Sequence, residues 1–326
     1  MSNRRHPKRT ADVIKLIKQR AFEGVDKDNF SPSSINKTLA LANKINRKRK
    51  VYISDYILIL DENINWLSEI SDTLLIIVMT AKRKKKKWTA ILLLLSNVVS
   101  QLISIKILLL SGLDVPAKQL VRCCVEHIDV AISLSLNDHL VGEFLRFKNI
   151  DGRLGAREFW KRFLKSRPNA GFKQQMNSKI AAELGKRNMS KWIKYINQEE
   201  TILNACVHPS YIASSMNLTG TEYLFNSGEE ITIPNYYGLI DRSSLRTMNF
   251  LIMSIFRYSL FGYFPKYSEL PTSIKFDNMI KDQIKKSCEY IECGRLLIFG
   301  LANHHIQMYK ETKPKNKRQH LVDSTS

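Results

Sequence analysis

Residues 89–115 read TAILLLLSNVVSQLISIKILLLSGLDV and form the most apolar stretch of the chain. A helix of about 20 such residues is long enough to cross a bilayer. Polar side chains are nevertheless distributed through its middle, at Ser96, Asn97, Ser100, Gln101, Ser104 and Lys106. Because a lysine at the centre of a bilayer costs about 2.5–3.5 kcal/mol, we predict a central helix of a helical bundle, buried on most sides by its neighbours. A membrane span is the alternative, since the basic run just before the stretch satisfies the positive-inside rule.

The residues after this stretch predict an antiparallel helix pair. Gly112 is expected to end the apolar helix, and Pro116 has the position that proline takes in the first turn of the next helix. A connection this short joins antiparallel neighbours. Apolar residues at three- and four-residue steps predict further helices, over residues 10–24, 32–45, 56–79, 138–165 with a break near 151, 173–187, 190–208, 241–261 and 276–310. Residues 211–234 are more polar and are expected to form a short hairpin or an extended loop.

The composition favours an all-α fold. The 326 residues include 13 Gly and 9 Pro, which is few for a β-sandwich or a barrel. We predict three parts: an N-terminal helical arm with a basic linker over residues 1–87, a helical bundle over 88–311, and a disordered basic tail over 312–326.

The chain is strongly basic, with 51 Lys and Arg against 30 Asp and Glu and a formal net charge of +21. Such a charge attracts polyanions, and RNA, DNA and an anionic membrane surface all meet that description. The predicted nucleic-acid contacts are the run Lys82, Arg83, Lys84, Lys85, Lys86 and Lys87, together with Arg146, Arg153 and Arg157, which alternate with aromatic residues. A solvated linker or helix end explains the run equally well, because cations are favourable at a helix C-terminus.

No metal or other cofactor is expected from the sequence. The five cysteines contain no CxxC pair and no histidine at zinc-ligand spacing, and their apolar surroundings indicate reduced, buried thiols. The first residues lack the apolar run of a signal peptide, so we expect a cytoplasmic protein. P-loop, GxGxxG, HExxH and GxSxG elements do not occur, which removes the usual support for ATPase, dehydrogenase, zinc-protease and α/β-hydrolase functions.

Five polar residues could carry chemistry on a phosphodiester: Arg122, Glu126, Asn204, His208 and Ser210. The first two are four residues apart, so they share a helix face. The stretch TILNACVHPSYIASS, residues 201–215, predicts a helix that stops at Pro209, with Asn204 and His208 on one face. An intrahelical ion pair and a histidine that caps a helix are the structural alternative.

The spacing from Arg122 to His127 matches the loose pattern of Arg, four to six residues and His that defines the HEPN ribonucleases. A Leu-rich helix, the turn LLLSGLDVPAKQLVR, the Arg and Glu pair and a later His-Pro-Ser at a helix end together resemble a family of uncharacterised bacterial all-helical proteins distantly similar to the HEPN superfamily. The resemblance covers roughly residues 89–264. Cys123 departs from it, because the pattern normally has a polar residue there, and Thr201–Leu203 stand where an Arg is expected upstream of His208.

The resemblance implies a phage-defence or toxin effector that binds RNA and cuts it without a metal ion. In that reaction His208 would transfer protons, and Arg122 would hold the phosphate. Glu126 would orient one of them, and Asn204 or Ser210 would hold the scissile group. Sites of this kind are generally completed across a two-fold axis, so a homodimer is implied.

Two other functions stay open. A membrane-acting effector would use residues 89–111 and the neighbouring lysine run to reach an inner membrane. A non-enzymatic subunit would use the basic surface to hold a nucleic acid or a partner protein of a defence system. The missing Arg upstream of His208 is compatible with RNA or nucleotide binding without cleavage.

Overall fold

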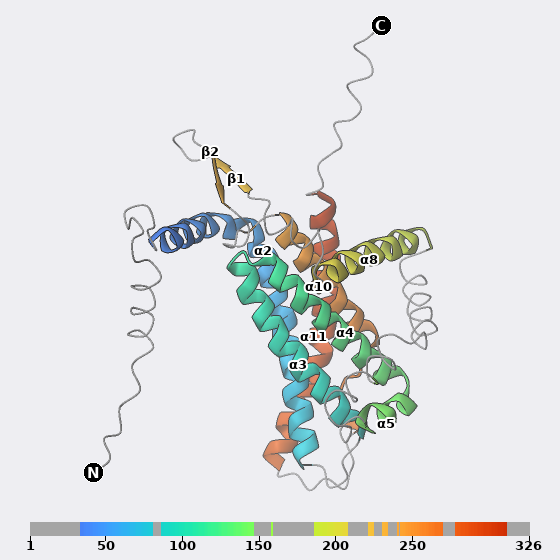
Figure 1. The fold of residues 1–326 in the computed structure, drawn as a ribbon. Coiled ribbons are helices and arrows are strands. Elements are labelled where there is room, and N and C mark those ends of the chain that lie inside the picture. Colours follow the sequence, from blue (N-terminus) through green and yellow to red (C-terminus); the bar gives the residue numbers. More distant parts are fainter. Residues whose placement is uncertain are drawn as a thin grey trace, which may run out of the picture.

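The computed structural model describes residues 33–80, 86–146, 158, 186–207, 221–224, 230–233, 240, 242–269 and 278–311. Within these ranges the chain is helical apart from short connections and one small hairpin (Figure 1), so the all-α prediction is confirmed for this part of the protein. The predicted helix over residues 10–24 and the predicted disordered tail over 312–326 lie outside the described residues. The elements in chain order are α2 (Ser33–Thr80), α3 (Lys86–Leu110), α4 (Asp114–Leu136), α5 (Asp138–Arg146), α8 (Lys186–Val207), β1 (Thr221–Leu224), β2 (Glu230–Ile233), α10 (Arg242–Phe261), the 3-10 helix η4 (Tyr267–Glu269) and α11 (Asn278–Glu311).

The predicted antiparallel pair is formed by α3 and α4, which lie side by side in Figure 1. Gly112 in their connection has a φ of 74°, a backbone conformation that glycine adopts without a steric penalty. Pro116 lies in the first turn of α4, as expected. At the other end of the pair, Lys87 Nζ donates a hydrogen bond to the carbonyl of Ser135 at 2.8 Å, which joins the start of α3 to the end of α4.

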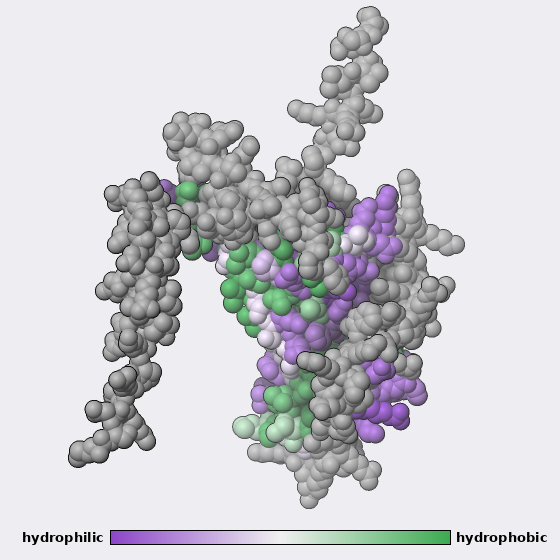
Figure 2. All heavy atoms as spheres, viewed as in Figure 1, coloured by the Kyte–Doolittle hydropathy of each residue, from purple (hydrophilic) through white to green (hydrophobic). Residues whose placement is uncertain are grey.

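The central helix of the bundle is α10, and the prediction that residues 89–111 would be buried on most sides is wrong. Every residue from Thr247 to Ser259 is buried, because α10 packs against α2, α4 and α11. Helix α3 buries one face and leaves Leu93, Ile103 and Ile107 exposed by 51%, 46% and 59%. Figure 2 shows such hydrophobic side chains on the visible surface of the described helices. Apolar content alone therefore overestimated how many sides of α3 have neighbours.

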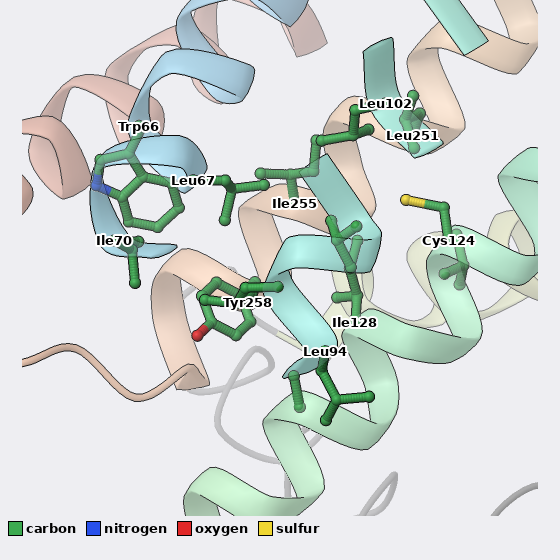
Figure 3. Close-up of a cluster of buried hydrophobic side chains, with 14 of the residues drawn as sticks. Trp66, Leu67, Ile70, Leu94, Leu102, Cys124, Ile128, Leu251, Ile255 and Tyr258 are labelled. Atoms are coloured by element: carbon green, nitrogen blue, oxygen red, sulfur yellow. The ribbon is translucent and has the colours of Figure 1, made fainter. Parts of the chain in front are cut away.

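The larger hydrophobic core runs through the described helices (Figure 3). Helix α2 contributes residues to the same cluster as α3, α4 and α10, because its face from Ile53 to Ile77 is buried among them. The labelled members in Figure 3 are Trp66, Leu67, Ile70, Leu94, Leu102, Cys124, Ile128, Leu251, Ile255 and Tyr258. The core thus contains residues from both sides of positions 87 and 88, where the sequence suggested a boundary between an arm and a bundle.

Helix α2 is one continuous helix of 48 residues, whereas the sequence predicted two helices over 32–45 and 56–79. The cluster at residues 46–50 was expected to interrupt it, but its four basic residues, 47–50, are good helix formers. Asn46 in this segment is buried, donates through Nδ2 to the carbonyl of Ser111 at 3.2 Å and accepts from the amide of Ile240 at 2.9 Å. These two contacts hold the segment in the fold and explain why the helix continues.

The polar region between α8 and α10 contains the hairpin that the sequence left as one of two possibilities. Strands β1 and β2 pair antiparallel, with Thr221 opposite Ile233 and Leu224 opposite Glu230. The two strands form a separate two-stranded sheet, so they do not change the helical character of the core.

Candidate functional site

Arg122 and Glu126 form the ion pair that their spacing predicted, on a partly exposed face of α4. Arg122 Nε lies 3.0 Å from Glu126 Oε1, and the two side chains are 26% and 32% exposed. The carboxylate thus orients the guanidinium, while the remaining guanidinium donors stay within reach of solvent. A guanidinium held in this way can receive a phosphate by bidentate hydrogen bonding.

His127 does not join this ion pair. Its Nδ1 lies 2.7 Å from the carbonyl oxygen of Cys123, one turn earlier in the same helix. The Cys123 side chain is exposed, but partial burial, together with the charge of Glu126, raises the pKa of its thiol. Near neutral pH this thiol is therefore ionised to a smaller extent than that of a free cysteine, and neither residue adds an activated nucleophile beside Arg122.

Helix α8 packs against α4 close to Arg122. Gln119 Nε2 donates to the carbonyl of Cys206 at 2.9 Å, and Gln119 precedes Arg122 by three residues, so both side chains lie on the same side of α4. Leu203 and Cys206 on α8 are buried, with 5% and 1% exposure. The C-terminal turn of α8 therefore lies against α4 about one helical turn from the candidate arginine.

Buried charges fix α8 at this position. Glu199, whose side chain is 4% exposed, forms an ion pair with Arg246 of α10. Lys118 of α4 forms an ion pair with Asp114, and Asp114 in turn accepts a hydrogen bond from Thr247 at 2.8 Å. Burial raises the pKa of Glu199 above its usual value, although Arg246 and Lys118 oppose the shift. Helices α4, α8 and α10 thus meet around charged groups that have partners.

The remaining candidates divide between described and undescribed residues. Asn204 is exposed on α8, two residues before the Cys206 contact. His208 and Ser210 lie outside the described residues, since α8 ends at Val207. The fold brings the end of α8 close to the helix that carries Arg122 and Glu126. Two of the five candidate residues, His208 and Ser210, follow that end and lie outside the described part of the chain.

The predicted basic contacts also divide. Lys82, Arg83, Lys84 and Lys85 lie in the connection between α2 and α3, and Arg153 and Arg157 follow α5, all outside the described residues. Lys87 is held by three groups: Asp138 Oδ1 at 2.8 Å, the Ser135 carbonyl and the ring of Tyr263, whose centroid is 5.2 Å from Nζ. Its described contacts give Lys87 a structural role.

A pocket of about 730 Å³, which we call the lysine pocket, lies at the start of α3 and is lined in part by Lys86 and Arg146. Both side chains are exposed, and neither has an ion-pair partner among the described residues. His139, 77% exposed, lies 3.4 Å from Glu143 at its rim. The lining residues are Lys86, Lys87, Trp88, Asp138, His139, Val141, Gly142, Glu143, Arg146 and Tyr263. An anion at the rim would meet two cations with no carboxylate paired to them in the described structure.

The sequence did not indicate that Tyr263 belongs to this pocket. Its hydroxyl accepts a hydrogen bond from Trp88 Nε1, although 175 residues separate the two. A second missed feature is Arg257 on α10, 2% exposed, with Nη2 3.1 Å from Asp129 Oδ1. The signal for this pair was an arginine in the middle of an apolar helix, since a buried cation needs an anionic partner.

Among the described residues no cluster of three or more His, Cys, Asp or Glu has the arrangement of a metal site. The chain matches no known protein-family model, no curated protein and no solved structure. The HEPN resemblance therefore rests on the short motifs alone.

Proposed function

We propose that this protein is a bacterial defence or toxin effector that binds RNA and cleaves it by metal-independent HEPN-type chemistry, with Arg122 as the phosphate-binding residue and His208 as the proton-transfer residue. The observation that carries the proposal is the hydrogen bond from Gln119 to the Cys206 carbonyl. It anchors the chain two residues before His208, at a point three residues along α4 from Arg122. Arg122 on α4 and His208 after α8 thus both lie within three residues of this one contact between the two helices.

RNA supplies its own nucleophile for such a reaction. A base removes the proton of the ribose 2′-hydroxyl, whose oxygen attacks the adjacent phosphorus, and an acid protonates the departing 5′-oxygen. A histidine suits both proton transfers because its ordinary pKa is close to neutrality. Arg122, oriented by Glu126, would neutralise the charge that develops on the phosphate oxygens. Asn204 or Ser210 would position the scissile group.

Affinity for RNA would come from the basic surface. The net charge of +21 supports this part of the proposal, as do Lys86 and Arg146 at the lysine pocket, which have no ion-pair partner among the residues that the structure describes. Lys82 to Lys85, Arg153 and Arg157 would add phosphate contacts. Binding would then weaken steeply with salt, because each neutralised phosphate releases counterions.

The proposal is tested by measuring cleavage of a fluorescein-labelled single-stranded RNA of about 30 nucleotides by the purified full chain. EDTA is present to remove divalent metal ions. We expect Arg122→Ala and His208→Ala each to lower cleavage by about 100-fold or more, the scale of general acid–base catalysis. Arg295→Ala is the matched control, because Arg295 forms a similar ion pair with Glu292 on α11, with 35% and 53% exposure. Cleavage at the wild-type rate by all three variants would remove Arg122 and His208 from the site. RNA that is bound and stays intact at every protein concentration would support a non-enzymatic binding subunit.

The expected homodimer and a partner protein belong to the same proposal. Light scattering on the purified chain measures the first, and a dimer whose disruption stops cleavage would support a site completed by two copies. Co-purification with products of neighbouring genes measures the second. A fully active monomer would exclude both requirements.

Membrane association is the second candidate function, supported by α3. This is the one described helix long and apolar enough to span a bilayer by length and composition, and Leu93, Ile103 and Ile107 are exposed on it. Against it, Lys106 pairs with Asp61 of α2 and the opposite face of α3 is buried in the core. Recovery of the protein in a carbonate-resistant membrane pellet would favour this function over a cytoplasmic ribonuclease.

A further inference from the structure

A second basic surface lies on the N-terminal part of α2. Between Ser33 and Ser54 the sequence contains no Asp or Glu, and the first carboxylate of the helix is Asp55. Six cations occupy the same segment: Lys37, Lys44, Arg47, Lys48, Arg49 and Lys50. This part of the chain therefore has a positive charge that no acidic residue of its own segment offsets.

Four of these cations form one exposed surface, which we call the α2 basic face: Lys44, Arg47, Lys48 and Lys50. Lys44, Arg47 and Lys48 are three and four residues apart, so they project from one side of the helix. Within the described part of the chain none of the four has an ion-pair partner. Like charges at this spacing repel each other and destabilise the helix, and no described carboxylate relieves the repulsion.

The rest of the fold fixes the direction in which this face points. On the opposite side of the helix Ala42, Ile45 and Asn46 are buried, and Asn46 bonds both Ser111 and Ile240. Arg49 is directed inward and donates to the Ile240 carbonyl. The helix is therefore held with its apolar side against the protein and the α2 basic face toward solvent.

This orientation favours a polyanion over a bilayer. A helix that binds a membrane surface inserts its apolar side among the lipids, but here Ala42 and Ile45 are already buried. The exposed residues from 40 to 50 are Ala40, Asn43 and the four cations, and the exposed apolar side chains Leu39 and Val51 lie at either end of them. The ammonium and guanidinium groups between these ends match a phosphate backbone. The α2 basic face is also distant from the lysine pocket. Asn46 contacts Ser111 just after the end of α3, whereas Lys86 starts that 25-residue helix, a separation of about 37 Å at ~1.5 Å per residue.

We propose that the α2 basic face is a second contact site for the phosphate backbone of RNA, separate from the lysine pocket. The proposal takes its ligand from the proposed function, and it concerns binding, independently of cleavage. Four phosphate contacts to a single strand contribute about 0.7 each to the slope of log affinity against log salt. Their loss lowers the slope by about 3.

The test is the salt dependence of binding by the full-length protein, measured by fluorescence anisotropy with a 30-nucleotide single-stranded RNA. The variant Lys44→Gln, Arg47→Gln, Lys48→Gln, Lys50→Gln leaves Asn46 and Arg49 in place, and a melting temperature no lower than that of the wild type verifies its fold. Between 50 and 200 mM salt, wild-type affinity should fall about 50-fold more than that of the variant, which is the same slope of about 3. The control variant Lys266→Gln, Lys281→Gln, Lys285→Gln, Lys286→Gln removes the same charge from the η4 and α11 region and should keep most of the wild-type slope.

Three outcomes would overturn the proposal: an equal loss of slope in both quadruple variants, no loss in the α2 variant, or wild-type protein that fails to bind RNA at 50 mM salt. Vesicles containing 30% phosphatidylserine provide the other arm, and an α2 variant that loses vesicle binding but keeps RNA binding would also overturn it. Arg122→Ala distinguishes this proposal from the nuclease proposal, because it removes the phosphate-binding residue of the candidate cleavage site and leaves the α2 basic face unchanged. A wild-type protein that never cleaves RNA, but binds it with the α2-dependent slope, would refute cleavage and leave the second contact site standing.

Discussion

The indole of Trp66 on α2 packs directly on Gly294 of α11. A Cβ atom added at Gly294 would collide with the ring carbon Cδ1 and would lie 3.0 Å from Nε1. The same Nε1 donates a hydrogen bond to the carbonyl of Ile291 at 2.9 Å. Trp66 also contacts the rings of Tyr258 and Phe264, with centroids 6.2 and 5.5 Å away. Glycine at position 294 thus allows α11 to approach α2 closely enough for this hydrogen bond.

Gly294→Ala should destabilise the protein. Overpacking in a well-packed core costs about 1–3 kcal/mol, which exceeds the gain of about 1 kcal/mol from alanine's helix propensity. Gly300→Ala on the same helix is the control, since no atom lies within 4 Å of its added Cβ, and it should stabilise by up to about 1 kcal/mol. Urea denaturation measures both. Equal stability of the two variants would show that Trp66 does not pack on Gly294.

Loss of the Asn46 side chain should lower the stability of the protein more than loss of the side chain of a neighbouring exposed asparagine. Asn46→Ala leaves the Ser111 carbonyl and the Ile240 amide without their partner, and an unsatisfied buried polar group costs about 1–3 kcal/mol. Asn43→Ala, three residues earlier and exposed, should have little effect. Thermal melts compare the two variants, and identical melting temperatures would contradict the contact between α2, Ser111 and Ile240.

Replacement of Glu199 should change how stability depends on pH. Because burial raises the pKa of Glu199 in the folded state above its usual 4.5, the folded protein binds this proton more tightly than the unfolded chain. The stabilisation from the protonated carboxyl is complete below pH 4.5 and is lost as the pH rises through the folded-state pKa. Glu199→Gln cannot lose it, so the stability of this variant relative to wild type should increase from pH 4 to 7.

Chemical denaturation at a series of pH values gives the difference in unfolding free energy directly. Glu62→Gln, at an exposed position of α2, is the control and should track wild type. A flat difference for Glu199→Gln across this range would mean that Glu199 is not buried beside Arg246.

Thiol labelling should separate the cysteines by burial. Cys123 and Cys293 are exposed, and Cys124, Cys206 and Cys288 are buried. Burial also raises the pKa of Cys288 to about 11, which keeps it in the unreactive thiol form. Iodoacetamide should therefore modify Cys123 and Cys293 in native protein, and the other three only after unfolding.

The same experiment, read by mass spectrometry, reports on the candidate site. RNA bound at Arg122 should slow labelling of the adjacent Cys123 and leave Cys293 on α11 unaffected. Rapid labelling of Cys206 in native protein would contradict the packing of α8 on α4.

Local rules explain the parts of the fold that could be predicted from the sequence. Gly112 and Pro116 defined the α3–α4 connection because each has a backbone preference that acts within one or two residues. The Arg122–Glu126 ion pair followed from a spacing of four residues on one helix. The all-α class followed from composition and from three- and four-residue apolar steps, which need no knowledge of distant partners.

Only the tertiary structure decided which helix is central, why α2 continues through residue 50, and which cations are engaged. Lys87 is held by Ser135, 48 residues away, Gln119 by Cys206, 87 residues away, and Asn46 by Ile240, 194 residues away. Helix α10 is buried along its length although α3 is the more apolar helix, because burial depends on where the neighbouring helices lie around each helix axis. Those neighbours come from remote parts of the chain, so a pattern confined to a single helix cannot specify them.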